Sequence, residues 1–357
     1  MKKHNFFAGP AILPAPVIKE SARAAANWNG MGLSILEISH RSDEFVAIMD
    51  EAEALIRELL QINDDYAVLF LTGGASSQFF MVPMNILKDD ETACYVNTGT
   101  WATNAIEQAR RYGNVEVLAS SEEENFSYIP KDYEIPADAR YLHLTSNNTI
   151  FGTQLQAFPD IKTPLVCDMS SDIFSRPIDI TKFDLIYAGA QKNLGPAGVT
   201  LVIVKKSILG KVNRDIPTML DYRTHVKKQS SFNTPPVYPI FVCTLTLRWL
   251  KENGGLEAMQ AKNEAKAKLL YDAIDAHPLF KCPVAKEDRS LMNVNFVFKE
   301  GYEHLEKDFL AAAEAANCVG LAGHRSVGGF RASIYNAMPI SSVKVLVKVI
   351  KNFKQNS

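Results

Sequence analysis

Residues 187–198 read Tyr187-Ala188-Gly189-Ala190-Gln191-Lys192-Asn193-Leu194-Gly195-Pro196-Ala197-Gly198, a lysine between a short apolar run and a turn rich in glycine and proline. Most lysines stay at the surface, because burying an ammonium ion without a partner is costly. A lysine in a strand-end loop among small residues can be desolvated, which lowers its pKa and makes the neutral amine a nucleophile that can form an imine with an aldehyde. The alternative is an ordinary surface lysine in a turn, which is the more common case for this spacing alone.

Around this stretch, short apolar runs alternate with amphipathic segments. Continuous apolar runs predict strands that are covered on both faces. Strands interleaved with helices predict an α/β fold with a mostly parallel sheet. The predicted strands are Ala67–Leu71, Thr92–Val96, Tyr141–Leu144, Leu165–Cys167, Leu185–Ala188 and Val199–Val204. One predicted helix follows Gly73-Gly74 and runs through Leu87, and another covers Trp101–Arg111.

The pattern changes after about residue 255. Leu269, Leu270 and Ile274 lie at helical spacing near Ala273 and predict a long helix from Leu256 to His277. Asn293–Phe298 alternates polar and apolar residues, which predicts a strand with one solvated face. Further helices are expected over Phe309–Ala316 and Val343–Phe353.

Three units follow from this patterning. Pro10, Pro14 and Pro16 exclude a central strand or a helix interior at the start of the chain, so an N-terminal arm is expected. The predicted division is an arm over 1–15, a large domain over 16–254 and a smaller C-terminal α+β domain over 255–357.

Composition narrows the class of partner. Of 357 residues, 47% are hydrophobic and 22% charged, and 38 basic against 40 acidic residues give a net charge of −2. Nucleic-acid and membrane partners normally require a basic excess, so neither is expected. No signal peptide or membrane-spanning run is apparent, and a cytoplasmic location is expected.

The five cysteines are widely spaced and include no CxxC pair, which argues against a zinc site or a disulfide framework. They are Cys94, Cys167, Cys243, Cys282 and Cys318.

Three further positions suit a ligand with a ring and a phosphate. Asp168 closes the strand Leu165–Cys167, where it could keep a pyridine nitrogen protonated, although a helix cap or an Asx turn is an equally ordinary role. The turn Thr72–Ser77 joins a strand to a helix whose N–H groups suit a phosphate, although such turns more often serve packing alone. Trp101 begins the next helix and could stack on a cofactor ring, with core packing as the default.

Cations gather at His40-Arg41, His324-Arg325 and Arg331. Arginine side chains match carboxylate and phosphate oxygens bidentately, although each pair alone is more often a surface ion-pair partner. Five such groups in a chain of slightly negative charge favour a ligand with more than one acidic group. The order along the chain, from phosphate-type turn to aromatic, aspartate and lysine, carries more weight than any single position.

With these residues in this order, the chain resembles the phosphoserine aminotransferases. These are fold type I pyridoxal-phosphate enzymes with a large domain and a smaller C-terminal domain. The resemblance runs nearly end to end. Its most specific blocks are Glu37–Ser42, Gly73–Ser76, Ala188–Gly198, Asn233-Thr234-Pro235-Pro236 and Gly323-His324-Arg325-Ser326.

The resemblance implies roles for individual residues. Lys192 would be the Schiff-base lysine that also shuttles a proton, and Asp168 would pair with the pyridinium nitrogen. Arg331 would bind the α-carboxylate of the amino acid, and His40, Arg41, His324 and Arg325 would serve the distal phosphate or carboxylate. The other cofactor contacts would be Ala75, Ser76 and Gln191 at the phosphate, Trp101 on the ring, Thr149 at the hydroxyl side, and Asn233 and Thr234 from the second subunit of a homodimer. No metal is implied.

Some members of the family carry an arginine where this chain has Ser76, so here the substrate phosphate would depend on the histidine–arginine pairs. The implied reaction is transamination from L-glutamate to 3-phosphohydroxypyruvate, which gives O-phospho-L-serine for serine biosynthesis and, in some bacteria, extends to pyridoxine biosynthesis. The alternatives are a related aminotransferase acting on alanine, serine or glyoxylate, a cysteine desulfurase, or a non-catalytic binding protein on the same scaffold.

Overall fold

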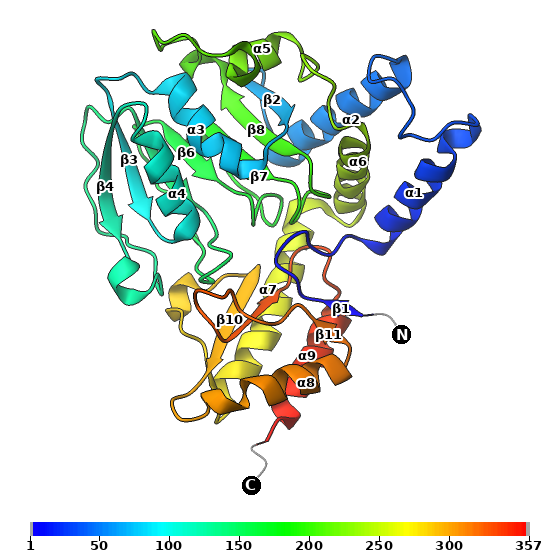
Figure 1. Cartoon of the computed structure of the whole chain (residues 1–357), viewed down its shortest axis with the longest axis vertical. Helices are drawn as coiled ribbons and strands as arrows, with labels where there is room; N and C mark the ends of the chain where they lie inside the picture. The colour runs from blue at the N-terminus through cyan, green and yellow to red at the C-terminus, as the bar shows by residue number, and fades with distance from the viewer. Residues whose placement is uncertain (1–2, 355–357) are drawn as a thin grey trace.

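Seven strands form the central sheet of the molecule, in the order β2-β8-β7-β6-β5-β3-β4 (Figure 1). The computed structural model describes residues 3–354. Neighbouring strands are parallel except where β8 pairs antiparallel with β2 and β7, so the mostly parallel sheet is confirmed. The strands are β2 (Tyr66–Leu71), β3 (Thr92–Asn97), β4 (Asn114–Ser120), β5 (Tyr141–Thr145), β6 (Leu165–Asp168), β7 (Leu185–Gly189) and β8 (Thr200–Lys205).

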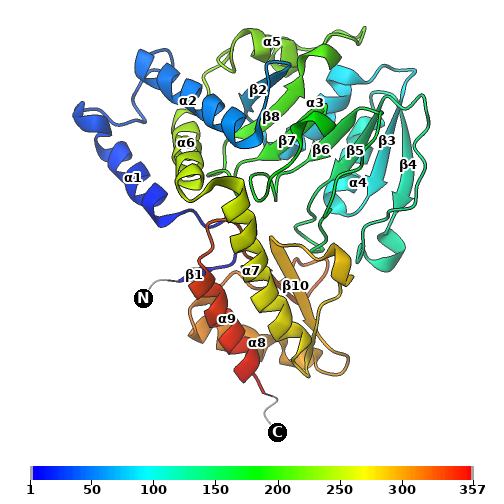
Figure 2. The ribbon, with the colours of Figure 1, turned by 180° about the vertical axis from the view of Figure 1, so that it is seen from behind.

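Both faces of this sheet are covered, which explains the continuous apolar runs. In β2, Val68 and Phe70 face one hydrophobic cluster, while Ala67, Leu69 and Leu71 face another. Figures 1 and 2 show the two helical layers from opposite sides. The first contains α1 (Ala15–Ala26), α2 (Asp43–Leu60) and α6 (Val237–Glu252), and the second contains α3 (Gly74–Ile86), α4 (Thr100–Ala109) and the short α5 (Tyr222–Lys227).

A second, smaller sheet lies below the first in Figure 1, in the order β12-β10-β9, with antiparallel pairing throughout. Its hydrophobic core is separate and is rich in phenylalanine, including Phe280, Phe296, Phe309 and Phe330. The predicted division at residue 255 falls between α6 and α7 and stays a prediction. The elements of this part are α7 (Gly255–Asp275), β9 (Phe280–Lys281), β10 (Asn293–Phe298), α8 (Glu306–Ala315), β11 (Cys318–Val319), β12 (Phe330–Ser333) and α9 (Ile340–Asn352).

The prediction that β10 has one solvated face is wrong. Asn293 and Asn295 are 0% and 5% exposed, because the turn that follows β5 covers them. Nδ2 of Asn147 donates to Oδ1 of Asn293 at 2.8 Å, and Nδ2 of Asn295 donates to the carbonyl of Ile150 at 2.5 Å. Buried amides are tolerated when they are hydrogen-bonded, and here they join the smaller part to the larger one.

The residues before α1 run along the smaller part and then past the central sheet. β1 (His4–Asn5) pairs in parallel with β11, and Phe6 is buried in the phenylalanine-rich core. Further on, the Ala11 N–H donates to the carbonyl of Gln191 at 2.8 Å. The start of the chain therefore reaches the loop that carries Lys192. In the described part of the chain, no helix is long and apolar enough to cross a membrane.

Candidate active site

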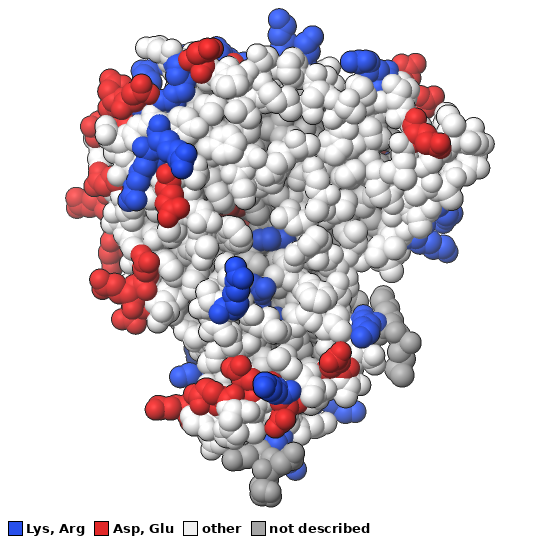
Figure 3. Space-filling view, viewed as in Figure 1, with Lys and Arg blue, Asp and Glu red and all other residues white. Residues whose placement is uncertain are grey.

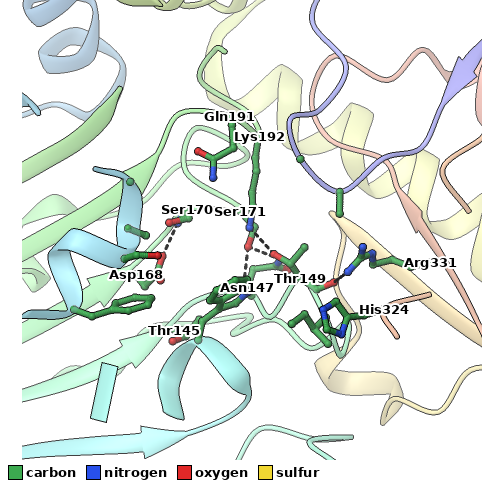
Figure 4. Close-up of a pocket in the computed structure, with 18 residues that line it drawn as sticks. Thr145, Asn147, Thr149, Asp168, Ser170, Ser171, Gln191, Lys192, His324 and Arg331 are labelled. Atoms are coloured by element: carbon green, nitrogen blue, oxygen red, sulfur yellow. Dashed lines mark hydrogen bonds between the residues drawn. The ribbon is translucent and has the colours of Figure 1, made fainter. Parts of the chain in front are cut away.

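A cavity of about 330 Å³ lies where β5, β6 and β7 end, between the two parts of the molecule (Figure 4). The carboxyl edge of a parallel sheet is where α/β proteins bind ligands, because side chains from several strand-end loops converge there. Its lining includes residues from both parts and from the N-terminal segment: Ala8, Gly9, Gly74, Ala75, Ser76, Phe79, Trp101, Thr145, Asn147, Thr149, Ile150, Asp168, Ser170, Ser171, Gln191, Lys192, His324 and Arg331.

Lys192 extends into the middle of this cavity, and Figure 4 shows Asp168 and Arg331 on opposite sides of it. Its Nζ donates to Oγ1 of Thr149 at 2.6 Å. Burial lowers the pKa of Lys192 to about 8; the positive charge of Arg331 acts in the same direction, and the negative charge of Asp168 opposes it. A substantial fraction of the amine is therefore neutral near pH 8, as a nucleophile requires.

Asp168 ends β6 and is 5% exposed. Its Oδ1 accepts a hydrogen bond from the Ser170 N–H at 2.9 Å. Burial raises the pKa of Asp168, while the Ser170 hydrogen bonds and the charge of Lys192 lower it. A carboxylate in this setting is stabilised by a nearby cation, and a protonated pyridine nitrogen would provide one. The site fits pyridoxal phosphate in this respect.

The start of α3 offers main-chain N–H groups to the same cavity. Gly73, the N-cap residue, has φ 94° and gives no side-chain cap, and no acidic residue occupies the first turn. A Cβ on Gly73 would come within 1.9 Å of Oγ of Ser77, so only glycine fits. Gly74, Ala75 and Ser76 line the cavity, where the uncapped N–H groups and the positive end of the helix dipole suit a phosphate.

Apart from Nε of Arg331, two buried polar atoms in the lining have no hydrogen-bond partner among the described residues. They are Nε1 of Trp101, in the first turn of α4, and Oγ1 of Thr145, at the end of β5. Buried donors and acceptors are seldom left unpaired, so a bound group that pairs with them is favoured.

Arg331 supplies positive charge from the smaller part, and His324 adds an imidazole that can be protonated. Nη1 of Arg331 donates to the carbonyl of Thr149 at 3.2 Å, while its buried Nε has no partner among residues 3–354. Burial and the charges of Arg331 and Arg325 lower the pKa of His324. Figure 3 shows Lys or Arg side chains in the middle of the face where the two parts meet, with Asp and Glu mainly at the left edge and the lower end. This side of the cavity suits an anion.

The cavity thus brings together most of the residues singled out in the sequence: Ala75, Ser76, Trp101, Thr149, Asp168, Gln191, Lys192, His324 and Arg331. The others do not line it. His40 and Arg41 lie in the turn before α2, Asn233 and Thr234 lie before α6, and Arg325 is exposed beside His324.

Sequence reasoning missed four polar residues of the lining, namely Thr145, Asn147, Ser170 and Ser171. Thr145 ends β5, and the two serines lie two and three residues after the end of β6. The rule that singled out Asp168, a polar residue at the end of a buried strand, applies equally to these residues and could have found them.

Comparison with known proteins agrees with this arrangement. Residues 4–346 match the family described as aminotransferase class-V. A phosphoserine aminotransferase of Parabacteroides distasonis is 60% identical over 355 residues, which cover 99% of each chain. The structure of the phosphoserine aminotransferase from Bacillus circulans subsp. alkalophilus has a TM-score of 0.95 at 47% identity, with 98% of each chain covered. That of the pyridoxal-phosphate-bound enzyme from Trichomonas vaginalis has a TM-score of 0.94 at 37% identity, covering 98% of this chain and 100% of that one.

The chain belongs to the class V aminotransferases and, within that class, to the phosphoserine aminotransferase family.

Proposed function

We propose that the protein transfers the amino group of L-glutamate to 3-phosphohydroxypyruvate, giving O-phospho-L-serine and 2-oxoglutarate, with pyridoxal 5′-phosphate as cofactor. The observation that carries this proposal is one cavity in which a lysine of lowered pKa, a buried carboxylate and an uncapped helix start face an arginine and a histidine. The names of the relatives, at up to 60% identity, support the same reaction.

When bound, pyridoxal phosphate supplies an electron-accepting ring that makes the Cα proton of an amino acid removable. Lys192 holds the cofactor through Nζ and moves that proton, because its amine is neutral in part near pH 8. Asp168 keeps the ring nitrogen protonated. The remaining contacts we assign are Ala75, Ser76 and Gln191 to the phosphate, Trp101 to the ring face and Thr149 to the hydroxyl side.

Substrate anions are bound on the cationic side of the cavity. Arg331 binds the α-carboxylate, which its unpartnered Nε supports. His324 and Arg325 bind the distal phosphate or γ-carboxylate. The lowered pKa of His324 leaves the free imidazole mostly neutral near pH 7, and a bound dianion favours its protonation.

The second half of our proposal is a homodimer with shared active sites. His40, Arg41, Asn233 and Thr234 do not line the cavity of their own chain, so we assign them to the site of the partner. Exposed apolar side chains lie close to them in the sequence, as expected for a buried subunit interface. These are Met31, Leu33, Leu36, Val46 and Phe232.

We also propose a cytoplasmic location. All five cysteines are free, four of them buried, and reduced thiols are typical of that compartment.

A comparison of amino acceptors tests the function. Purified protein supplied with cofactor and glutamate is given 3-phosphohydroxypyruvate, pyruvate or glyoxylate, and kcat/KM is measured for each. We expect the phosphorylated acceptor to be preferred by at least about tenfold, because only its dianion engages the distal cations fully. Faster turnover of pyruvate or glyoxylate would assign the protein to the small-substrate aminotransferases, and the absence of a visible absorption band would favour a binding protein.

A further inference from the structure

One turn, Asn147–Gly152, contacts residues on both sides of the site. Thr149 is its central residue, since its Oγ1 accepts from Nζ of Lys192 and its carbonyl accepts from Nη1 of Arg331 (Figure 4). Asn148 reaches the loop before Trp101, where its Nδ2 donates to Oγ1 of Thr98 at 3.1 Å. The position of this turn therefore affects both the amine and the guanidinium.

The smaller part of the molecule holds this turn in place through β10. Oδ1 of Asn293 accepts from Nδ2 of Asn147, and Nδ2 of Asn295 donates to the Ile150 carbonyl. The approach is close: Gly152 has φ 84°, and a Cβ there would lie 3.0 Å from the Asn293 carbonyl oxygen and 3.1 Å from Cγ of Asn295. A glycine is needed at this position both because φ is positive and because a Cβ would crowd the two asparagines.

Asn295 is also paired with Arg331 in the ladder between β10 and β12. Directly paired residues place their side chains on the same face of a sheet. In this pair, Arg331 binds the carbonyl of Thr149 and Asn295 binds the next carbonyl, that of Ile150. Two adjacent peptide groups of the turn are thus fixed by two adjacent strands of the smaller part.

We propose that Asn295 is a positioning residue, which fixes the turn so that the Thr149 hydroxyl meets Nζ of Lys192 and the Thr149 carbonyl orients Arg331. The proposal rests on the assignment of Lys192 as the cofactor lysine and of Arg331 as the carboxylate ligand. Asn295 itself does not line the cavity and acts only through the turn.

Substituting Asn295→Leu tests this role, because it keeps the branched arrangement of side-chain heavy atoms while removing the donor to the Ile150 carbonyl. A displacement of about 1 Å at a site can lower turnover by up to about 10²-fold. We expect kcat/KM for glutamate to fall by about 10- to 100-fold, with part of the loss in KM because Arg331 is misplaced.

A second readout does not depend on turnover. In protein freed of cofactor, the rate of capture of pyridoxal phosphate is followed against pH, which reports the pKa of the Lys192 amine. Loss of the Thr149 acceptor destabilises the protonated amine, so the midpoint in Asn295→Leu should fall below that of the unchanged protein.

The matched control is His277→Leu. His277 is a buried polar side chain in the same part of the molecule, and its Nε2 hydrogen-bonds to the Phe353 carbonyl at 3.1 Å, away from the turn. We expect a comparable loss of thermal stability in this variant, with the capture midpoint and kcat/KM unchanged.

Gly152→Ala provides a second route if Asn295→Leu does not fold, because the new Cβ pushes the turn away from the same two asparagines. The proposal is supported if Asn295→Leu or Gly152→Ala shifts both readouts and His277→Leu shifts neither. It is overturned if the folded variants match His277→Leu. Failure of the underlying assignment of Lys192 would look different, since the unchanged protein would then show no cofactor band at all.

Discussion

Lys192 has its unusual acidity because the two carboxylates near it do not fully compensate for its burial. Asp168 and Asp172 favour the ammonium form, Arg331 opposes it, and desolvation exceeds all of them. The pKa of about 8 is therefore a property of the assembled cavity and not of the loop sequence. A lysine at the same strand end without Arg331 and the covering smaller part would titrate closer to its ordinary value of 10.5.

The pH dependence of cofactor capture follows directly. Only the neutral amine attacks an aldehyde, so the capture rate should rise with pH through a midpoint near 8 before it levels off. Lys192→Ala should show no visible band. Stopped-flow absorbance of cofactor-free protein mixed with pyridoxal phosphate measures this rate. A midpoint near 10.5, the ordinary value for a lysine, would contradict the proposed environment.

Site residues could be predicted from the sequence where their role depends on the residues next to them in the chain. Asp168 and Lys192 could be singled out because each directly follows, or closes, an apolar run. Asn295 could not, because its partner Ile150 lies far away in the sequence, and alternation with Val294 and Phe296 is equally typical of a solvated strand face. Only the fold shows which surface covers those asparagines.

Among the elements, α3 depends most visibly on a single position. Its first N–H groups are free for an anion because Gly73 turns the chain with φ 94° instead of capping the helix through a side chain. Any larger residue meets Ser77, whose Oγ would lie 1.9 Å from the new Cβ.

Gly73→Ala should therefore destabilise the protein by about 1–3 kcal/mol and weaken the binding of pyridoxal phosphate, since the helix start must shift. Thermal unfolding and equilibrium dialysis of the cofactor measure the two effects. Gly30→Ala is the control, because Gly30 also has positive φ, 76°, but nothing lies within 4 Å of its added Cβ. Equal effects of both substitutions on cofactor binding would show that backbone strain alone, and not the fit at α3, is responsible.

Strands could be predicted from the sequence where their side chains are buried on both faces of the sheet. The predicted strands of the central sheet form with ends that differ by at most one residue, because their apolar runs are covered on both faces. β4 was missed, since it is an edge strand with polar residues such as Asn114 and Glu116, much of it exposed. The antiparallel direction of β8 was also not predicted, because an apolar run reads the same in either direction.

For the whole molecule, Lys266 in α7 links stability to pH. It is 2% exposed, and its Nζ donates to the carbonyls of Ile334 and Tyr335 at 2.8 and 2.7 Å. Burial, and to a lesser extent the charge of Lys262, lowers its pKa to about 7. Between this value and 10.5 the unfolded chain binds the proton more tightly, so stability rises with pH in that range and is insensitive to this group below it.

Lys266→Met should remove this dependence. Between about pH 7 and 10, the free energy of unfolding of the unchanged protein should rise relative to the variant by up to about 1.4 kcal/mol per pH unit. Urea unfolding across the range measures it, and Lys268→Met, an exposed lysine on the same helix, should run parallel to the unchanged protein. Parallel curves for Lys266→Met as well would show that Lys266 stays charged.

Shared active sites are testable by complementation. Lys192→Ala and the double variant Asn233→Ala/Thr234→Ala are each expected to be poorly active, since one lacks the amine and the other lacks phosphate contacts. In a mixed dimer, one of the two sites would contain all native residues. After subunit exchange, roughly a quarter of the native activity should return. No recovery despite exchange, verified by two different affinity tags, would place Asn233 and Thr234 in the site of their own chain.

The pairing of β1 with β11 also affects the order in which the protein can be completed during synthesis. The segment around Phe6 leaves the ribosome well before its partners in the phenylalanine-rich core, which include Cys318, Leu321 and Phe330. Until those residues have been translated, this segment has no place to dock, and the apolar side chain of Phe6 remains accessible to chaperones. The nascent chain can thus form its central sheet early, but it can close the cavity only after His324 and Arg331 have been synthesised.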